Sequence, residues 1–174
     1  MTFDYLAESA LTASGQFYSD AVDGASLALV LNDCIRSLQN LDMLKKAFFY
    51  GKPYKLDEKY CINEPSGISY PDPDYVHGIL GIATEAGELL EALEKVLFED
   101  ADLDVTNVME EVSDCQWYEA MLARKANMTF DDIQRMNIKK LRARFGEKFT
   151  EYDAIHRDLV TERAILEDGV SQSK

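Results

Sequence analysis

The four prolines of this 174-residue chain all lie between Pro53 and Pro73. Proline removes a backbone donor and disrupts helix interiors, so the long stretches on either side of this segment are free to form helices. From Lys55 to Tyr75 the sequence is rich in proline, glycine, serine, asparagine and aspartate. It predicts an irregular loop of about twenty residues, which is long for a compact domain. Such a loop is either functional or a tether between an N-terminal helical pair and the remaining bundle.

Helical patterns occupy the chain on both sides of this loop, because apolar residues recur there at steps of three, four and seven. The expected helices cover approximately residues 3–22, 27–51, 77–98, 105–125, 129–146 and 151–168. Gly51, Gly146 and Gly169 are the expected helix ends, and Thr129 with Asp132 forms an expected capping pair. No segment predicts a strand.

These patterns predict an all-α fold, a helical bundle in one compact domain. An apolar content of 47% is enough to fill a single core in a soluble, globular chain of this length. The expected organisation is an N-terminal helical segment at 1–54, the loop at 55–76, a helical core at 77–168 and a tail at 169–174.

The charge balance argues against several classes of function. A net charge of −14 and a pI near 4.5 disfavour nucleic-acid binding, which needs clustered Lys and Arg in excess. A small phosphorylated ligand held by a metal and a few local cations is compatible with this charge. The N-terminal sequence lacks a secretory pattern, and no apolar run approaches the length of a membrane span. We therefore expect no nucleic-acid partner and no membrane association.

Three cysteines, Cys34, Cys61 and Cys115, are an odd number without Cys-x-x-Cys spacing. Two of them lie in helical apolar patterns. We interpret them as reduced core or near-surface thiols, which favours a cytoplasmic location.

Two short acidic pairs carry the strongest functional signal: Glu85 with Glu88, and Glu111 with Asp114, separated by 22 residues. Residues three apart lie on one face of a helix, so each pair directs two carboxylates the same way. Two such helices packed antiparallel would bring four carboxylates together. Like charges about 4 Å apart repel by roughly 4 kcal/mol at an effective dielectric near 20. A hard divalent cation such as Mg²⁺, for which Mn²⁺ can substitute, would remove this repulsion.

The surroundings of the pairs strengthen this interpretation. Glu85 falls between Ile82 and Leu89 on an apolar stripe, where a carboxylate must be paired or bound to metal. Gly87 costs about 1 kcal/mol of helix propensity, which suggests close approach by another helix or a ligand. The second helix carries a polar seam formed by Asp104, Asn107, Glu111, Asp114 and Tyr118. Two ordinary solvated helix faces are the plainer alternative.

Other metal sites fit less well. A ferritin-like di-iron site needs a histidine three residues after a glutamate, and neither His77 nor His156 is so placed. An EF-hand needs oxygen ligands around a central glycine, which the segment from Asp72 to Asp74 lacks.

A third helical segment offers donors on one face, since Asn137, Lys140 and Arg144 follow at steps of three and four. Lysine and arginine suit phosphate oxygens, and asparagine can bind a sugar hydroxyl, a base edge or water. Alone, this pattern is more typical of a solvated basic face. Opposite a metal-binding set of carboxylates, it predicts the second side of a polyphosphate site.

Taken in order, these residues resemble the MazG-like all-α nucleoside triphosphate pyrophosphohydrolases, whose signature is Glu-x-x-Glu, a spacer and Glu-x-x-Asp. The chain reads GIATEAGELLE from Gly81 and NVMEEVSDCQWY from Asn107. The segment NIKKLRARF from Asn137 is similar to the family's Asn, Lys-Leu and Arg-Tyr segment, with Phe145 in place of the commoner tyrosine. RDLVTER, from Arg157, is similar to phage-type and small bacterial members. The resemblance covers roughly residues 76–165.

The resemblance implies a fold, an activity and a set of site residues. It implies metal ligation by Glu85, Glu88, Glu111 and Asp114, and substrate contacts from Asn137, Lys140 and Arg144. The expected reaction is Mg²⁺-dependent hydrolysis of a nucleoside triphosphate between the α and β phosphates, giving a monophosphate and pyrophosphate.

Glu88 and Glu111 are the expected catalytic carboxylates, with Glu88 as general base if it stays free of metal. Asn107 on the polar seam is a further candidate for substrate binding. We expect the base to rest against aromatic side chains, with Trp117 as a candidate and core filling as its alternative role. The resemblance also implies a homodimer or homotetramer, in the host cytoplasm if the chain is phage-encoded.

Two other functions stay open from the sequence. The same site could hydrolyse an alarmone or a modified nucleotide, because base choice depends on loop geometry. Alternatively, the chain could be a non-catalytic acidic helical module that binds a basic partner through its charge of −14.

Overall fold

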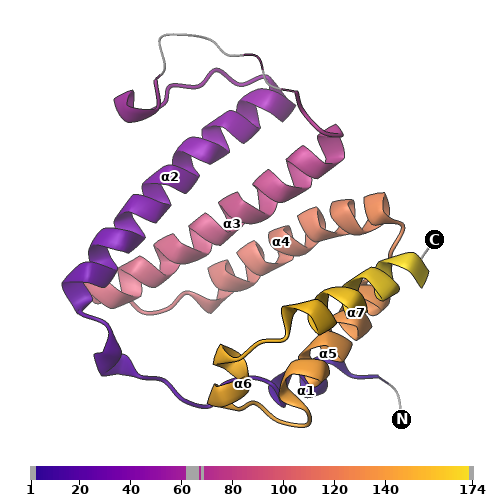
Figure 1. Cartoon of the computed structure of the whole chain (residues 1–174). Helices are drawn as coiled ribbons and strands as arrows, with labels where there is room; N and C mark the ends of the chain where they lie inside the picture. The colour runs from indigo at the N-terminus through magenta and orange to yellow at the C-terminus, as the bar shows by residue number, and fades with distance from the viewer. Residues whose placement is uncertain (1–2, 62–66, 68, 173–174) are drawn as a thin grey trace. The chain divides into compact units, whose positions relative to one another are not determined.

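The computed structural model describes residues 3–61, 67 and 69–172, and within them all regular structure is helical, as the sequence predicts. Asn63, Pro65 and Ser66 of the expected loop lie outside the described residues. The elements, shown in Figure 1, are α1 (Tyr5–Ala10), η1 (Ser19–Ala21), α2 (Gly24–Tyr50), η2 (Glu58–Tyr60), α3 (Pro73–Phe98), α4 (Val105–Ala126), α5 (Phe130–Phe145), α6 (Glu151–Ile155) and α7 (Leu159–Gln172).

The chain forms two compact units, where the sequence predicts one compact domain. We call them the terminal unit, Met1–Ser19 with Ala123–Lys174, and the central unit, Asp20–Leu122. The expected N-terminal segment at 1–54 is therefore divided between them. The reason lies in α1, which packs with α5: the Tyr5 hydroxyl donates to Asn137 Oδ1 at 3.2 Å, and Glu8 forms an ion pair with Arg142.

In the central unit, α2 and α3 lie side by side in opposite directions (Figure 1). Helix α2 starts after the Asp23 cap and ends at Gly51, whose φ of 63° only glycine adopts without strain. Helix α3 begins before the expected His77, because Asp72 caps it and Pro73 occupies its first turn.

Small residues on α3 bring its neighbours close. A Cβ added to Gly81 would lie 2.2 Å from the Tyr118 ring of α4, and one added to Gly87 would lie 2.9 Å from Leu38 Cβ of α2. The close helix approach predicted from Gly87 is thus present. These close approaches set the position of α3 against α2 and α4, and Glu85 of α3 is buried between them.

In the terminal unit, the predicted capping pair is confirmed: Thr129 and Asp132 form a capping box at the start of α5. The helix expected over residues 151–168 is wrong in two respects. It is broken between α6 and α7, because the Asp158 side chain accepts from the Thr161 N–H at 3.0 Å and starts a new helix. It also continues past Gly169, which packs against Met136 and does not end the helix.

The N-terminal helix is shorter than the expected 3–22. Beyond α1, the Thr12 hydroxyl bonds to the Ser9 carbonyl and the Gln16 N–H bonds to the Ser14 hydroxyl, so side chains compete with helical hydrogen bonds. The three cysteines are free, with Cys34 and Cys61 exposed and Cys115 half-buried. None of the described helices combines the length and apolar character that crossing a membrane requires.

Candidate metal centre

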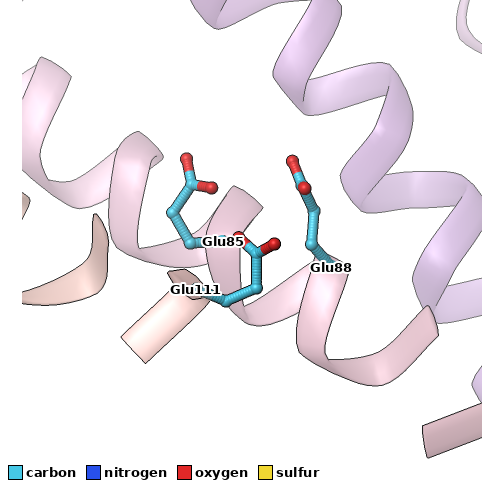
Figure 2. Close-up of side chains that lie close together, drawn as sticks. All are labelled: Glu85, Glu88 and Glu111. Carbon is cyan, nitrogen blue, oxygen red and sulfur yellow. The ribbon is translucent and has the colours of Figure 1, made fainter. Parts of the chain in front are cut away.

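Three carboxylates converge in the central unit. Glu85 and Glu88 project from α3 and Glu111 from α4, and one oxygen from each lies within 4.8 Å of the others (Figure 2). Glu85 is 7% exposed and Glu111 5% exposed, while Glu88 is exposed. Glu85 and Glu88 lie on one face of α3, as their spacing predicts. Glu111 of α4 lies at the same face.

The fourth expected ligand, Asp114, is exposed and lies outside this group. A step of three residues leaves a side chain about 60° away from its predecessor around the helix, and aspartate is shorter than glutamate. The structure therefore brings together three of the four predicted carboxylates. The charge of Asp114 still contributes to the electrostatics of Glu111.

The surroundings of Glu111 destabilise the ionised form of its carboxylate. Burial raises its pKa to about 7, and the charges of Glu88 and Glu85 add to this. Burial and the charge of Glu85 also raise the pKa of Glu88. Within the described part of the chain, no side chain or backbone N–H donates a hydrogen bond to either residue. Glu88 and Glu111 therefore accept no hydrogen bond from the described residues, although the positive charge of Lys46 acts on Glu88.

Glu85 differs because it has a partner that sequence reasoning missed. Lys45 of α2 is 3% exposed, and its Nζ lies 3.0 Å from Glu85 Oε1. A signal for it existed in the sequence: Lys45 lies four residues after Leu41 and seven after Leu38, on the apolar stripe of α2. A lysine on such a stripe needs a buried acceptor, as Glu85 needs a buried donor.

A cavity of about 290 Å³ opens beside the carboxylates, between α2 and α3. It is lined by Leu38, Gln39, Asp42, Thr84, Gly87, Glu88 and Glu91. Glu88 is the member of the carboxylate group that lines it. The cavity has room for several water molecules or a small polar group next to Glu88.

This set of donors suits a hard cation. All three ligands are carboxylates, the type that Mg²⁺ and Mn²⁺ prefer, and neither Glu88 nor Glu111 accepts a hydrogen bond from the residues that the structure describes. A divalent ion at this position would supply positive charge beside both carboxylates. The residues present therefore fit the metal that the motif implies.

The other candidates on α4 differ in exposure. Asn107 is half-buried, one turn before Glu111. Trp117 is 55% exposed, so the alternative that it fills the core is wrong. Its ring lies edge-on to His77, which in turn stacks on Phe49 with ring centroids 3.8 Å apart. The Nε2 atom of His77 is buried and has no hydrogen-bond partner among the described residues.

Asn137, Lys140 and Arg144 all lie on α5 of the terminal unit, so their expected place opposite the carboxylates stays a prediction. Asn137 and Lys140 are half-buried. Arg144 is already engaged: its Nε and Nη2 donate to the two oxygens of Glu162 at 2.8 Å and 2.5 Å. Arg157 contacts the same carboxylate at 2.6 Å. Sequence reasoning missed Glu162, which is 4% exposed.

Comparisons of the chain with protein-family models, with curated proteins and with solved structures found no match.

Proposed function

We propose that this chain is a Mg²⁺-dependent nucleoside triphosphate pyrophosphohydrolase, cleaving between the α and β phosphates to release a nucleoside monophosphate and pyrophosphate. The observation that carries the proposal is the group of three carboxylates from two helices, two of which accept no hydrogen bond from the described residues. The resemblance of the two acidic motifs and the α5 segment to the MazG-like family supports the choice of substrate.

When bound, Mg²⁺ would neutralise phosphate charge and lower the pKa of a coordinated water. Glu85 and Glu111 are the buried ligands in this proposal, since packing holds both side chains in place. Glu88 is exposed and lines the cavity, so it can reach a water and accept its proton as general base. Burial and the charge of Glu85 raise the pKa of Glu88, which makes it a better proton acceptor than an ordinary carboxylate.

The base of the nucleotide would rest on Trp117 in this proposal, because an exposed indole presents a flat apolar face to a planar ring. Lys140 is the proposed phosphate contact of α5. Arg144 already donates to Glu162 through Nε and Nη2, so in this proposal it would contact phosphate through its remaining N–H groups.

The test is product analysis. Purified chain would be incubated with Mg²⁺ and a panel of ribo- and deoxyribonucleoside triphosphates, guanosine tetraphosphate and oxidised nucleotides, and products would be separated by anion exchange. We expect monophosphate and pyrophosphate, with turnover abolished by EDTA and restored by Mg²⁺ or Mn²⁺. Diphosphate with inorganic phosphate, or full turnover in chelator, would contradict the proposal.

A matched pair of variants assigns the chemistry to the site. Glu88→Gln should lower kcat by about 10²- to 10⁴-fold, the usual contribution of a general base. Glu119→Gln is the control, since Glu119 is exposed on the same helix as Glu111 and lies outside the carboxylate group. It should keep activity within about twofold, because surface changes away from a site have small effects. Equal activity in both variants would exclude Glu88 from catalysis.

We also propose that the chain assembles as a homodimer or homotetramer. In the central unit, Leu29 is 72% exposed, Val30 68% and Met109 55%. Apolar side chains this exposed are typical of surfaces that contact a partner. Sedimentation equilibrium tests this, and a mass of one chain at micromolar concentration would contradict it.

A further inference from the structure

Lys45 is the most confined charged side chain near the carboxylates. Its ammonium nitrogen lies 2.6 Å from Thr84 Oγ1, 3.0 Å from Glu85 Oε1, 3.2 Å from Asp42 Oδ1 and 3.3 Å from the Tyr118 hydroxyl. It also lies 5.1 Å from the centroid of the Tyr118 ring. These groups belong to α2, α3 and α4, so one lysine connects all three long helices of the central unit.

The geometry satisfies the ammonium group completely. An ammonium has three protons, and oxygen atoms of four residues surround it at hydrogen-bonding distances. The carboxylate of Glu85 is the acceptor that belongs to the group of three. Glu85 Oε1 is therefore directed towards Lys45, which leaves its second oxygen for another ligand.

Within this group, three ionised carboxylates and one ammonium sum to −2, which one divalent cation would offset. Asp42 of α2 has a second partner in Lys46 of the same helix. The charges of Glu91, Glu110 and Asp114 add to the negative charge around the group. Without Lys45, the three carboxylates would carry −3 in a mostly buried position, where uncompensated charge is costly.

We propose that Lys45 is a positioning residue of the cation site that acts through its charge: bound to Glu85, its ammonium group partly neutralises the three carboxylates before a cation binds. Lys45 has this role only if the cation site of the proposed function exists. A lysine buried only for packing would not need to lie at hydrogen-bonding distance from a carboxylate of the cation site.

The experiment compares Lys45→Met, Lys45→Arg and Lys46→Met by thermal unfolding, without metal and with saturating Mn²⁺. Lys46→Met is the comparison variant: Lys46 also pairs with Asp42 and its charge acts on Glu88, but it makes no contact with Glu85, so its loss should change the Mn²⁺ shift less than the loss of Lys45. Lys45→Met should lower the metal-free melting temperature by about 5 °C or more, as expected on breaking a buried ion pair. Mn²⁺ should recover part of this loss, so its stabilising shift is larger in Lys45→Met than in the wild-type protein.

Two further variants exclude a purely structural role. Lys45→Arg keeps the charge and should show the wild-type Mn²⁺ shift. Adding Glu88→Gln to Lys45→Met removes one like charge, so the double variant should melt at a higher temperature than Lys45→Met alone. If Lys45→Met does not fold, the double variant should still yield folded protein.

The outcomes separate this inference from the proposed function. A Mn²⁺ shift in Lys45→Met equal to that of the wild-type protein, with no gain from Glu88→Gln, would overturn the role of Lys45 while leaving the cation site standing. A wild-type protein that shows no Mn²⁺ shift would overturn the cation site, and with it the positioning role.

Discussion

Glu111 is the residue at which the carboxylate group is most easily probed. Its pKa is raised from 4.5 to about 7, first by burial and then by Glu88 and Glu85. Between these two values the folded state holds a proton that the unfolded state has released. The stability of the metal-free protein should therefore fall as pH rises through this window.

Glu111→Gln removes this titration. We expect the variant to be more stable than the wild-type protein above pH 7, by roughly 1–3 kcal/mol, because a neutral amide replaces a charge that opposes folding. Urea unfolding from pH 5 to pH 8, in chelator, measures the difference, with Glu119→Gln as the control. Parallel pH profiles for the wild-type protein and Glu111→Gln would contradict the assignment.

The pKa of Glu162 is shifted in the opposite direction from that of Glu111. Hydrogen bonds from Arg144 and Arg157 lower its pKa from 4.5 to about 2. The folded state therefore keeps this carboxylate ionised where the unfolded state takes up a proton. The stability that Glu162 contributes is fully present above pH 4.5 and is lost as pH falls towards 2.

Glu162→Gln should flatten this acid dependence and destabilise the protein at neutral pH by about 3–5 kcal/mol, since two arginines lose their buried partner. Unfolding free energies at pH 7 and pH 3 give the comparison. Glu167→Gln on the same helix is the control, because Glu167 pairs with Arg163 at the surface. If both variants lose equally little stability, Glu162 does not hold α7 on α5.

The sequence indicated an important side chain where a local pattern made that side chain unusual. Glu85 stood out on an apolar stripe, and the structure buries it. Glu162 had no such mark, because its arginine partners lie five and eighteen residues away and the fold alone brings them together. The Lys45 partner of Glu85 lies forty residues away, so only the packing of α2 on α3 reveals the pair.

At the scale of elements, the contact between α3 and α4 depends on Gly81. Gly81→Ala would place a Cβ 2.2 Å from the Tyr118 ring, whose hydroxyl contacts Lys45. We expect a loss of about 1–3 kcal/mol from overpacking. Chemical denaturation measures it, and Gly15→Ala is the control because no atom lies within 4 Å of the added Cβ. A neutral effect of Gly81→Ala would show that α4 can move away from α3 without cost.

Helix positions were predictable where caps and periodicity agreed. The Thr129 and Asp132 capping pair and the ends at Gly51 and Gly146 are present as expected. The break between α6 and α7 was not predictable in this way. The apolar residues of both helices follow one continuous pattern, while a local hydrogen bond of Asp158 starts the second helix. A glycine gives no indication by itself of whether it ends a helix or, as Gly169 does, allows close packing.

At the scale of the whole molecule, the sequence predicted the all-helical class but not the division into two units. Composition and periodicity are properties of neighbouring residues. The joining of residues 3–19 to the C-terminal helices depends on contacts across more than a hundred residues, such as that of Tyr5 with Asn137. For the same reason, the sequence could identify residues on α5 whose side chains suit phosphate, but it could not locate them relative to the carboxylates.

In this proposal Glu85, Glu88 and Glu111 form one divalent-cation site, with Glu85 and Glu111 as its buried ligands and Glu88 beside the bound ion, and Mn²⁺ binding to the metal-free protein tests it. Electron paramagnetic resonance would follow free Mn²⁺ during titration of the wild-type protein, Glu111→Gln and Glu119→Gln. We predict tight Mn²⁺ binding by the wild-type protein and Glu119→Gln, and at least about tenfold weaker binding in Glu111→Gln, which loses a charged ligand. Equal Mn²⁺ affinity in all three proteins, or no binding to the wild-type protein, would contradict the claim.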